Sequence, residues 1–348
     1  MGYTVEHQVK FSGNAKEYFG IWIVNILLSI VTLGIYSAWA KVRTNRYFYG
    51  NTSIDGHAFD YHATGKQILI GRIIVVGALI AMQILTQVAP IVGIILLLIY
   101  LGLFPWLIVK GLQFSRRMTS YRNVRFDFKG TYGGAFWAFI ALPILNIFTI
   151  YLITPYVSRA LSNFLAKNSQ YGDRNFDLEM PVAPLYKVFA IVLTTVLLLS
   201  AIFAFALYQS GMLNAITSGS TSTSTIIAVY ALVIPIYIIL LIGFLAYNVA
   251  VRNTIYNHLI LDEKHSFGST LALGRYAFIA ITNVIVVLLT LGFMSPWAKV
   301  RMARYLASQT TVSVQGNLDE YTSSVKSSSG VVGSEFMDME GVDVGLGV

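Results

Sequence analysis

Seven apolar stretches constrain the fold of this chain more than any other feature of its sequence. A helix needs about 20 apolar residues to cross the hydrocarbon core of a bilayer. The chain is 56% hydrophobic and 11% charged, whereas soluble domains carry about 25% charged residues. The sequence therefore predicts a multi-pass membrane protein. The stretches, each close to that length, cover residues 19–38, 68–86, 90–109, 136–157, 188–208, 226–251 and 271–296.

Positively charged residues argue against seven simple crossings. Lys and Arg cluster after the first, third, fourth, sixth and seventh stretches, whereas the connections at residues 87–90 and 209–225 carry no charge. Positive residues mark the cytoplasmic side of a membrane protein, so five clusters belong inside and two loops outside. Two long transmembrane hairpins and three shorter segments that enter and leave on one side meet this condition. Single crossings in place of the three re-entrant segments are the alternative.

One passage of 16 residues occurs twice. It reads TLGIYSAWAKVRTNRY at residues 32–47 and TLGFMSPWAKVRMARY at residues 290–305, with 11 identical positions. Self-similarity of this kind is the signature of a chain built from repeated units. We therefore expect five units. Three further copies, less similar, run over residues 105–128, 155–178 and 247–267.

Short alternating stretches accompany these units. Apolar and polar residues alternate at residues 5–11, 124–129 and 175–180, which is typical of half-buried strands. Short strands are stable only when several pair, so we expect one sheet on one side of the membrane. The predicted fold is a mainly α-helical membrane protein of about five strand–helical-hairpin units with short cytoplasmic β-strands. Residues 1–319 would form the membrane domain, and the Ser-, Gly- and acid-rich residues 320–348 a disordered tail.

A resemblance to a known family supports the membrane assignment. The passage FSGNAKEYFGIWIVNILLSIVTLGIYSAWAKVRTNRYFYGNTSIDGHAFDYHATG, at residues 11–65, is its most specific part. Together with PWAKVRMARY and the acidic end GSEFMDMEGVDVGLGV, it resembles the YjgN-like family, a bacterial inner-membrane domain of unknown function. The resemblance covers nearly the whole chain and implies a multi-pass protein of the bacterial inner membrane. It implies no activity, substrate or catalytic residues.

Polar residues at matched positions of the first and last apolar stretches are the candidate ligand or pathway residues. A buried amide needs a hydrogen-bond partner, so each Asn either bonds a neighbouring helix or lines a cavity near the TLG turn. Gly tolerates the backbone conformations that a reversal requires. The candidates are Asn25, Thr32, Gly34, Asn283, Thr290 and Gly292.

The Trp-basic-Tyr passages predict contacts with the membrane surface. Trp and Tyr favour the headgroup region, and Lys and Arg reach water from an apolar stem. The net charge is +8, and because the last 32 residues carry −5, the rest of the chain carries +13. A strongly basic membrane protein faces anionic headgroups, which implies either simple anchoring or a specific lipid site. The candidates are Trp39, Lys41, Arg43, Arg46, Tyr47, Trp106, Trp297, Lys299, Arg301, Arg304 and Tyr305.

The sequence contains no recognisable catalytic or metal-binding motif. There is no Cys, and the five His residues form neither HExxH nor a close helical pair. P-loop and GxSxG motifs are also missing. We therefore expect no cofactor, no metal and no enzyme activity. Acids are absent from the depths of the apolar stretches, which disfavours a proton-coupled pump.

Two function classes stay open on the sequence. The first is a transporter or channel for a small or amphiphilic solute, because repeats with broken helices are a recurrent transporter plan. The alternative is a non-catalytic scaffold that binds anionic lipid or a cytoplasmic partner. The expected partners are membrane lipids, a second copy of the chain and a cytoplasmic protein bound through the tail, but no nucleic acid.

Overall fold

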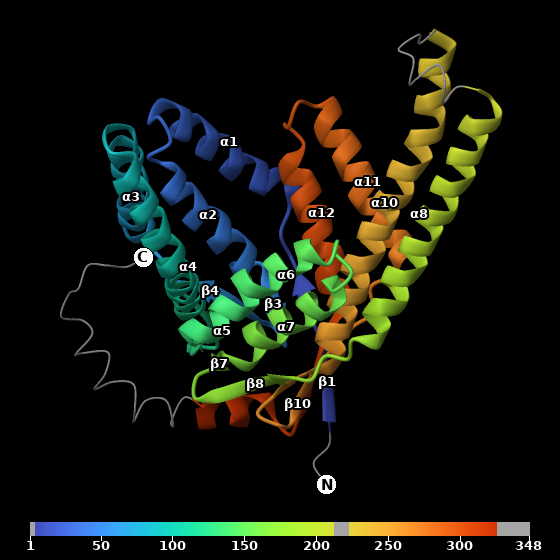
Figure 1. The fold of residues 1–348 in the computed structure, drawn as a ribbon. Coiled ribbons are helices and arrows are strands. Elements are labelled where there is room, and N and C mark those ends of the chain that lie inside the picture. Colours follow the sequence, from blue (N-terminus) through green and yellow to red (C-terminus); the bar gives the residue numbers. More distant parts are fainter. Residues whose placement is uncertain (1–3, 212–222, 326–348) are drawn as a thin grey trace.

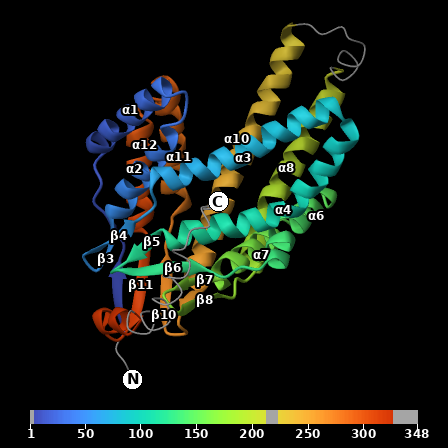
Figure 2. The ribbon, with the colours of Figure 1, turned by 90° about the vertical axis from the view of Figure 1, so that its left-hand side faces the viewer.

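Helical hairpins rise from a sheet at one end of the molecule (Figure 1). The computed structural model describes residues 4–211 and 223–325. The N-terminal strand and the last described helix, residues 318–325, both lie at the sheet end (Figures 1 and 2). The strands therefore share one side of the helical part, as their alternation predicts.

The sheet closes on itself almost completely. Every neighbouring pair of strands is antiparallel. In the described chain its order is β1-β11-β10-β9-β8-β7-β6-β5-β4-β3-β2. Its two ends, β1 and β2, are consecutive and separated only by Val9, so the sheet curls into a near-barrel, here called the strand ring. Its strands are β1 (Thr4–Gln8), β2 (Lys10–Phe11), β3 (Thr52–Ile54), β4 (His57–Tyr61), β5 (Thr119–Tyr121), β6 (Val124–Phe128), β7 (Ser169–Tyr171), β8 (Arg174–Leu178), β9 (Leu259–Leu261), β10 (His265–Ser269) and β11 (Thr310–Gln315).

Helical hairpins alternate with the strands along the chain. Each pair of helical arms is followed by a strand pair, except the last, which is followed by β11 alone, and β11 pairs with β1. The third hairpin has a composite first arm that contains a π-helical turn, η1. The helical elements are α1 (Ala15–Val31), α2 (Ser37–Gly50), α3 (Gly65–Val88), α4 (Pro90–Arg117), α5 (Tyr132–Phe136), η1 (Trp137–Ala141), α6 (Leu142–Phe148), α7 (Thr154–Lys167), α8 (Ala183–Gln209), α10 (Thr223–His258), α11 (Leu273–Leu289) and α12 (Ser295–Ser308).

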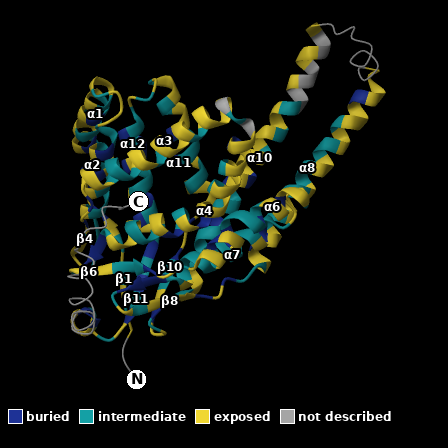
Figure 3. Ribbon diagram, turned by 60° about the vertical axis from the view of Figure 1, so that its left-hand side comes forward, coloured by how far each residue is buried: buried dark blue, intermediate teal, exposed yellow. Residues whose placement is uncertain are grey.

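Two of the hairpins are long enough to cross a membrane. In the described chain, the helices with suitable length and hydropathy are α3, α4, α8 and α10. No residue in the most apolar 18-residue window of α3 or α8 is buried in the protein, and the exposed faces of α8 and α10 are visible in Figure 3. Apolar faces that the protein does not cover need lipid around them. The two long transmembrane hairpins expected from the sequence are confirmed as helices of that length.

The three short hairpins reverse direction at sharp turns. Leu33 and Gly34 have φ values of +50° and +92°, and Leu291 and Gly292 have +49° and +92°. The N–H of Gly34 donates to the carbonyl of Ser29 at 2.7 Å, a bond typical of a helix that ends in a left-handed residue. The chain therefore turns back at TLG, as the re-entrant interpretation predicts.

The inner wall of the strand ring is a layer of aromatic side chains. Each of β4, β6, β8 and β10 has a Phe at its centre, and consecutive Phe rings lie 5.9–6.4 Å apart between centroids. The alternate residues Asp127 and Asp177 point outward and pair with Arg117 and Lys167. Period-two alternation thus gives the ring an apolar inside and a charged outside. The Phe layer consists of Phe59, Phe126, Phe176 and Phe267.

The C-terminal end of the described chain is a short helix. Residues 318–325 are helical, and Asn317 caps the helix by accepting a hydrogen bond from the N–H of Asp319 at 2.8 Å. Val325 is fully buried. The boundary expected at residue 320 between membrane domain and disordered tail therefore falls inside a packed helix. The rest of the expected tail, residues 326–348, lies outside the described residues.

Candidate functional site

A groove between α1 and α2 is the candidate functional site. It has a volume of about 550 Å³ and is lined along α1 by Tyr18, Trp22, Ile26 and Ile30. Side chains of α2, one residue of α3 and one of α12 complete it. We call this cavity the basic groove. Its remaining lining residues are Asn25, Ser29, Ser37, Ala40, Lys41, Thr44, Arg72 and Lys299.

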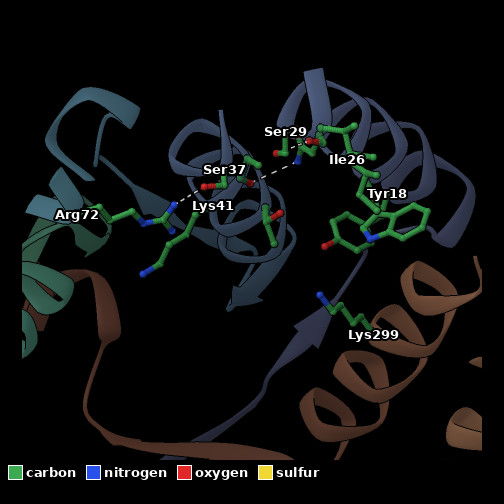
Figure 4. Close-up of a pocket in the computed structure, with 12 residues that line it drawn as sticks. Tyr18, Ile26, Ser29, Ser37, Lys41, Arg72 and Lys299 are labelled. Atoms are coloured by element: carbon green, nitrogen blue, oxygen red, sulfur yellow. Dashed lines mark hydrogen bonds between the residues drawn. The ribbon is translucent and has the colours of Figure 1, made fainter. Parts of the chain in front are cut away.

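Three cations from three different helices surround the basic groove. Lys41 and Arg72 lie on one side, and Lys299 reaches it from α12 on the other (Figure 4). None of the lining residues is acidic, and within the described chain none of the three cations makes an ion pair. Arg72 donates to the Ser37 hydroxyl at 2.5 Å. Uncompensated positive charge beside an apolar wall is suited to a ligand with an anionic head and an apolar body.

The basic groove and a second cavity lie along one face of α12. On α12, Lys299 lies one turn from Ala303 and shares its face, because residues four apart lie on one side of a helix. Ala303 and Leu306 line a second cavity of about 320 Å³ that reaches Phe59 and Phe267 in the strand ring. Lys299 therefore lies on the same face of α12 as a cavity that reaches the strand ring.

A second basic position lies where the helices meet the ring. Arg252 of α10 lies over the Tyr256 ring, 4.4 Å from its centroid, and donates to Thr310 at 2.9 Å. Tyr256 lines two cavities that reach the Phe layer from opposite sides. We call these two cavities the axial space. Arg116 lines one of them and Arg252 the other, and residues of the Phe layer line both.

The two matched asparagines tie their helices together. Asn25 donates to the Ala40 carbonyl at 3.4 Å and accepts from Arg43 at 3.2 Å. Asn283 makes the equivalent bonds to Ala298 and Arg301, each at 3.0 Å. Both are buried, so the hydrogen bond to a neighbouring helix is the alternative that the structure shows. Asn25 also lines the basic groove.

The candidate Thr and Gly residues build the hairpin turns. Thr32 accepts from the N–H of Tyr36 at 2.9 Å, and Thr290 accepts from Met294 at 3.2 Å. Gly34 and Gly292 adopt the left-handed conformation described above. The structure does not bring these four residues into the basic groove, whose lining includes Asn25 alone among the six pathway candidates. A role for them on a pathway stays a prediction.

The three tryptophans expected at the membrane surface are partly exposed. Trp39 lies against the start of α3, where its ring fills the space that a side chain at Gly65 would need. Arg301 stacks over Trp297 at 5.0 Å from the ring centroid. Trp106 is exposed on α4. Lipid contact at these positions stays a prediction, and the same holds for Lys41 and Lys299, which the structure assigns to the groove.

The structure corrects the expectation for the two tyrosines. Tyr47 is buried, and its hydroxyl donates to the carbonyl of Asn14 at 2.8 Å. Tyr305 is buried and bonds the carbonyl of Ala272 at 3.3 Å. A Tyr at these positions packs inward because its hydroxyl bonds the backbone at the start of the same hairpin, at the residue that precedes α1 or α11. Arg46 and Arg304 are exposed and donate to backbone carbonyls, at Tyr61 and Gly13. Lipid contact at these two positions stays a prediction.

Sequence reasoning missed several residues of the site. Arg72 is a charged residue after Gly near the start of the second apolar stretch, and no local signal placed it beside Lys41. Trp22 belongs to the first apolar stretch, at residues 19–38, and Tyr18 directly precedes that stretch. Half of the Phe layer did carry a signal, since Phe126 and Phe176 lie in the alternating stretches at residues 124–129 and 175–180. In the described chain no group of three or more His, Cys, Asp and Glu side chains is arranged to hold a metal.

Long apolar helices, reversing hairpins and a strand ring together define a multi-pass helical membrane protein. Residues 6–339 match the family described as "Bacterial protein of unknown function (DUF898)", and the chain belongs to that family. No solved structure matches the chain.

Curated relatives place the chain in the inner membrane. It is 25% identical to the "Inner membrane protein YjgN" of Salmonella typhimurium over 359 residues, covering 90% of this chain and 89% of the relative. It is 37% identical to the protein of the same name from Escherichia coli K12 over 140 residues, which cover 40% of this chain and 35% of that relative. The protein is a multi-pass inner-membrane protein, and the resemblance to the YjgN-like family is confirmed.

Proposed function

We propose that this protein binds anionic amphiphiles in the basic groove and moves them between the membrane and the axial space. The observation that carries the proposal is the placement of Lys41, Arg72 and Lys299, without acidic partners, around an apolar-lined cavity. A phosphate or carboxylate head would meet the cations, and an acyl or similar chain would lie along Trp22 and Ile26. The substrate class is therefore an anionic lipid or a related amphiphile.

We further propose that the chain consists of five related units arranged around one axis. Equal internal spacings support this. Asn25 and Arg43 are 18 residues apart, as are Asn283 and Arg301. Each buried tyrosine, Tyr47 or Tyr305, bonds a carbonyl 33 residues before it. Repeated hairpins around a common cavity are a frequent plan in transporters.

Binding can be tested with purified protein and a fluorescent phosphatidylglycerol in mixed micelles. Each basic residue near an anionic headgroup contributes about 1 kcal/mol. The double variant Lys41→Gln/Lys299→Gln should therefore weaken binding by roughly 30-fold. The matched control is Lys16→Gln/Lys66→Gln, which removes the same charge from exposed lysines outside the groove and should change binding less than twofold.

The binding result has a clear contrary outcome. Equal loss in both double variants would mean that net charge alone attracts the lipid, and the groove assignment would be wrong. A preference for zwitterionic phosphatidylethanolamine over phosphatidylglycerol would also contradict it.

Transport needs a separate measurement, because a scaffold could bind the same lipid. Proteoliposomes with tail-labelled fluorescent phosphatidylglycerol report movement between leaflets when dithionite quenches the outer leaflet. We expect protein-dependent movement that the Lys41→Gln/Lys299→Gln variant slows. Binding without any movement would favour the scaffold, whose charged surface would be the outer face of the strand ring.

A further inference from the structure

The helix at residues 318–325 occupies the open end of the strand ring. Leu318, Tyr321 and Thr322 line the lumen together with the Phe layer. Val325 is fully buried, and its Cγ1 lies 2.4 Å from where a Cβ on Gly172 would be. The helix therefore fits a space that the wall of the ring leaves for it, and Figures 1 and 2 show it at the end opposite the helical hairpins.

Charged residues at the rim hold this helix. Arg122, in the turn between β5 and β6, pairs with Asp319 of the helix and with Asp55 of the neighbouring turn, the latter at 2.8 Å. Its side chain is only 7% exposed. Asp319 itself is 74% exposed, so the shielded partner is Arg122, which would keep Asp55 alone as its carboxylate if the helix left. The rim thus gives the helix a specific seat in addition to apolar contact.

A buried histidine connects the helix to the wall of the ring. His265 of β10 packs edge-on against Tyr321, with 4.1 Å between ring centroids. Its Nδ1 accepts a hydrogen bond from the N–H of Gln315 at 3.2 Å. Gln315 is the last residue of β11, and Gly316 then turns the chain at φ +84°. The start and the middle of the helix are therefore fixed to the same strand pair.

Below the Phe layer little space is left. The lumen around the helix has a volume of about 90 Å³. It shares Phe126 and Phe176 with one axial cavity and Phe59 and Phe267 with the other. Among residues 4–211 and 223–325, the helix is thus the element that lies between the Phe layer and the surroundings of the sheet end.

We propose that the strand ring is a docking site for a short amphipathic helix and that residues 318–325 are its built-in plug, closing an axial passage through the ring. The inference rests on the proposed function only for the identity of the solute, an anionic amphiphile, that would pass through the ring. Seating and release of the plug concern Arg122, Asp319 and Tyr321, none of which belongs to the basic groove.

Single cysteines can report whether the lumen is closed. The chain has no Cys, so Leu261→Cys places one thiol on the lumen wall, where Leu261 is 8% exposed. The matched control is Ile260→Cys on the other face of the same strand, where Ile260 is 39% exposed. A small methanethiosulfonate reagent is applied to inverted membrane vesicles, and labelling rates are compared with and without Tyr321→Ala.

The plug predicts a selective effect. Tyr321→Ala should raise the labelling rate at Leu261→Cys by tenfold or more and leave Ile260→Cys unchanged. The peptide NLDEYTSSV, which is residues 317–325, should restore protection when added in excess, and the same peptide with Ala in place of Tyr should not. An unchanged rate at Leu261→Cys would overturn the proposal. A parallel rise at both cysteines would also overturn it, since the helix would then be part of the wall rather than a removable plug.

These outcomes are independent of the lipid experiment. No lipid ligand is added, and Lys41 and Lys299 stay unchanged. Failure of lipid binding with selective labelling would remove the proposed substrate and keep the plug, whereas the reverse result would keep the substrate and remove the plug.

Discussion

At the residue scale, identical side chains at matched positions of the first and last hairpins have different surroundings. Asn25 and Asn283 make matching bonds to a returning helix, but only Asn25 lines the basic groove. Lys41 and Lys299 are equivalent in sequence and come to the groove from different hairpins. Residues that hold the hairpins together thus lie directly beside residues that are free to meet a ligand.

The TLG glycine gives a first prediction about stability. Gly34→Ala should destabilise the protein by about 1–2 kcal/mol, because a side chain resists the left-handed conformation at φ +92°. Gly20→Ala in the same hairpin is the matched control. Gly20 lies within α1 and no neighbouring atom would meet its Cβ, so Ala should stabilise it by about 0.5–1 kcal/mol. Thermal unfolding in detergent measures both, and equal effects would contradict the assignment of the turn.

A buried asparagine gives a second prediction. Asn283→Ala should lower the free energy of unfolding by about 1–3 kcal/mol, because Arg301 and the Ala298 carbonyl lose their partner. Asn248→Ala is a suitable control, since Asn248 is a helix residue whose hydrogen bond to Phe244 is exposed. Denaturation in detergent should separate the two variants. A loss of lipid binding at unchanged stability would instead return Asn283 to the list of pathway residues.

At the element scale, the plug helix and the strand ring depend on each other. The helix contributes Tyr321 and Val325 to the apolar cluster that also holds Tyr121 and Tyr171 of the wall. Burial raises the pKa of Tyr171 and of Tyr321 above the ordinary value, so both hydroxyls stay neutral under physiological conditions. A neutral, aromatic interior is a condition for seating an amphipathic helix.

His265, which contacts the plug, predicts that the seating of the plug depends on pH. Burial lowers the pKa of His265 below its ordinary value of about 6.5, while Asp262 opposes this and Lys264 adds to it. The unfolded chain therefore takes up a proton first, and the stabilisation by neutral His265 is lost as pH falls below about 6.5. Protonation of Nδ1 would also abolish the hydrogen bond from the Gln315 N–H, because two N–H donors would then face each other. Between pH 7.5 and 5.5 we expect falling protection of Leu261→Cys.

The control for that dependence is His265→Asn. The Asn oxygen can still accept from Gln315 but has no charge to gain. Protection in this variant should be flat between pH 7.5 and 5.5. The same slope with and without His265 would show that another group titrates and that His265 is not responsible.

Much of the element scale could be predicted from the sequence. Alternation identified strands at residues 5–11 and 124–129, and charge placed every strand on one side. The closure of the sheet could not be predicted, because it depends on β1 pairing with β11 some 300 residues later. The plug could not be predicted either, because its composition resembles a solvated tail and the lumen that it shares is lined by residues of nine different strands.

At the scale of the whole molecule, helical hairpins of two lengths stand on one strand ring. The long pairs, α3 with α4 and α8 with α10, expose apolar faces that suit lipid. The short hairpins bring Lys41 and Lys299 to the basic groove, which Arg72 of the long helix α3 also lines. A basic groove, an aromatic floor and a plug then follow one another along the axis, which is the arrangement on which the transport proposal rests.

That arrangement requires the whole strand ring to face the cytoplasm. Topology mapping in spheroplasts tests this most directly, with an impermeant maleimide and one cysteine at a time. The chain offers positions outside the apolar helices on every unit, and Ser218, in the uncharged connection at 209–225, is the outside control. The test positions are Asp60, Asp127, Asp177, Lys264 and Gln315.

The account predicts that only the cysteine at Ser218 is labelled in intact spheroplasts. All five test positions should become reactive when the membrane is opened. Labelling of Asp177→Cys or Lys264→Cys from outside would mean that the short hairpins cross the membrane singly. The strands could then not form one ring on one side, and the groove, the axial space and the plug would lose their common axis.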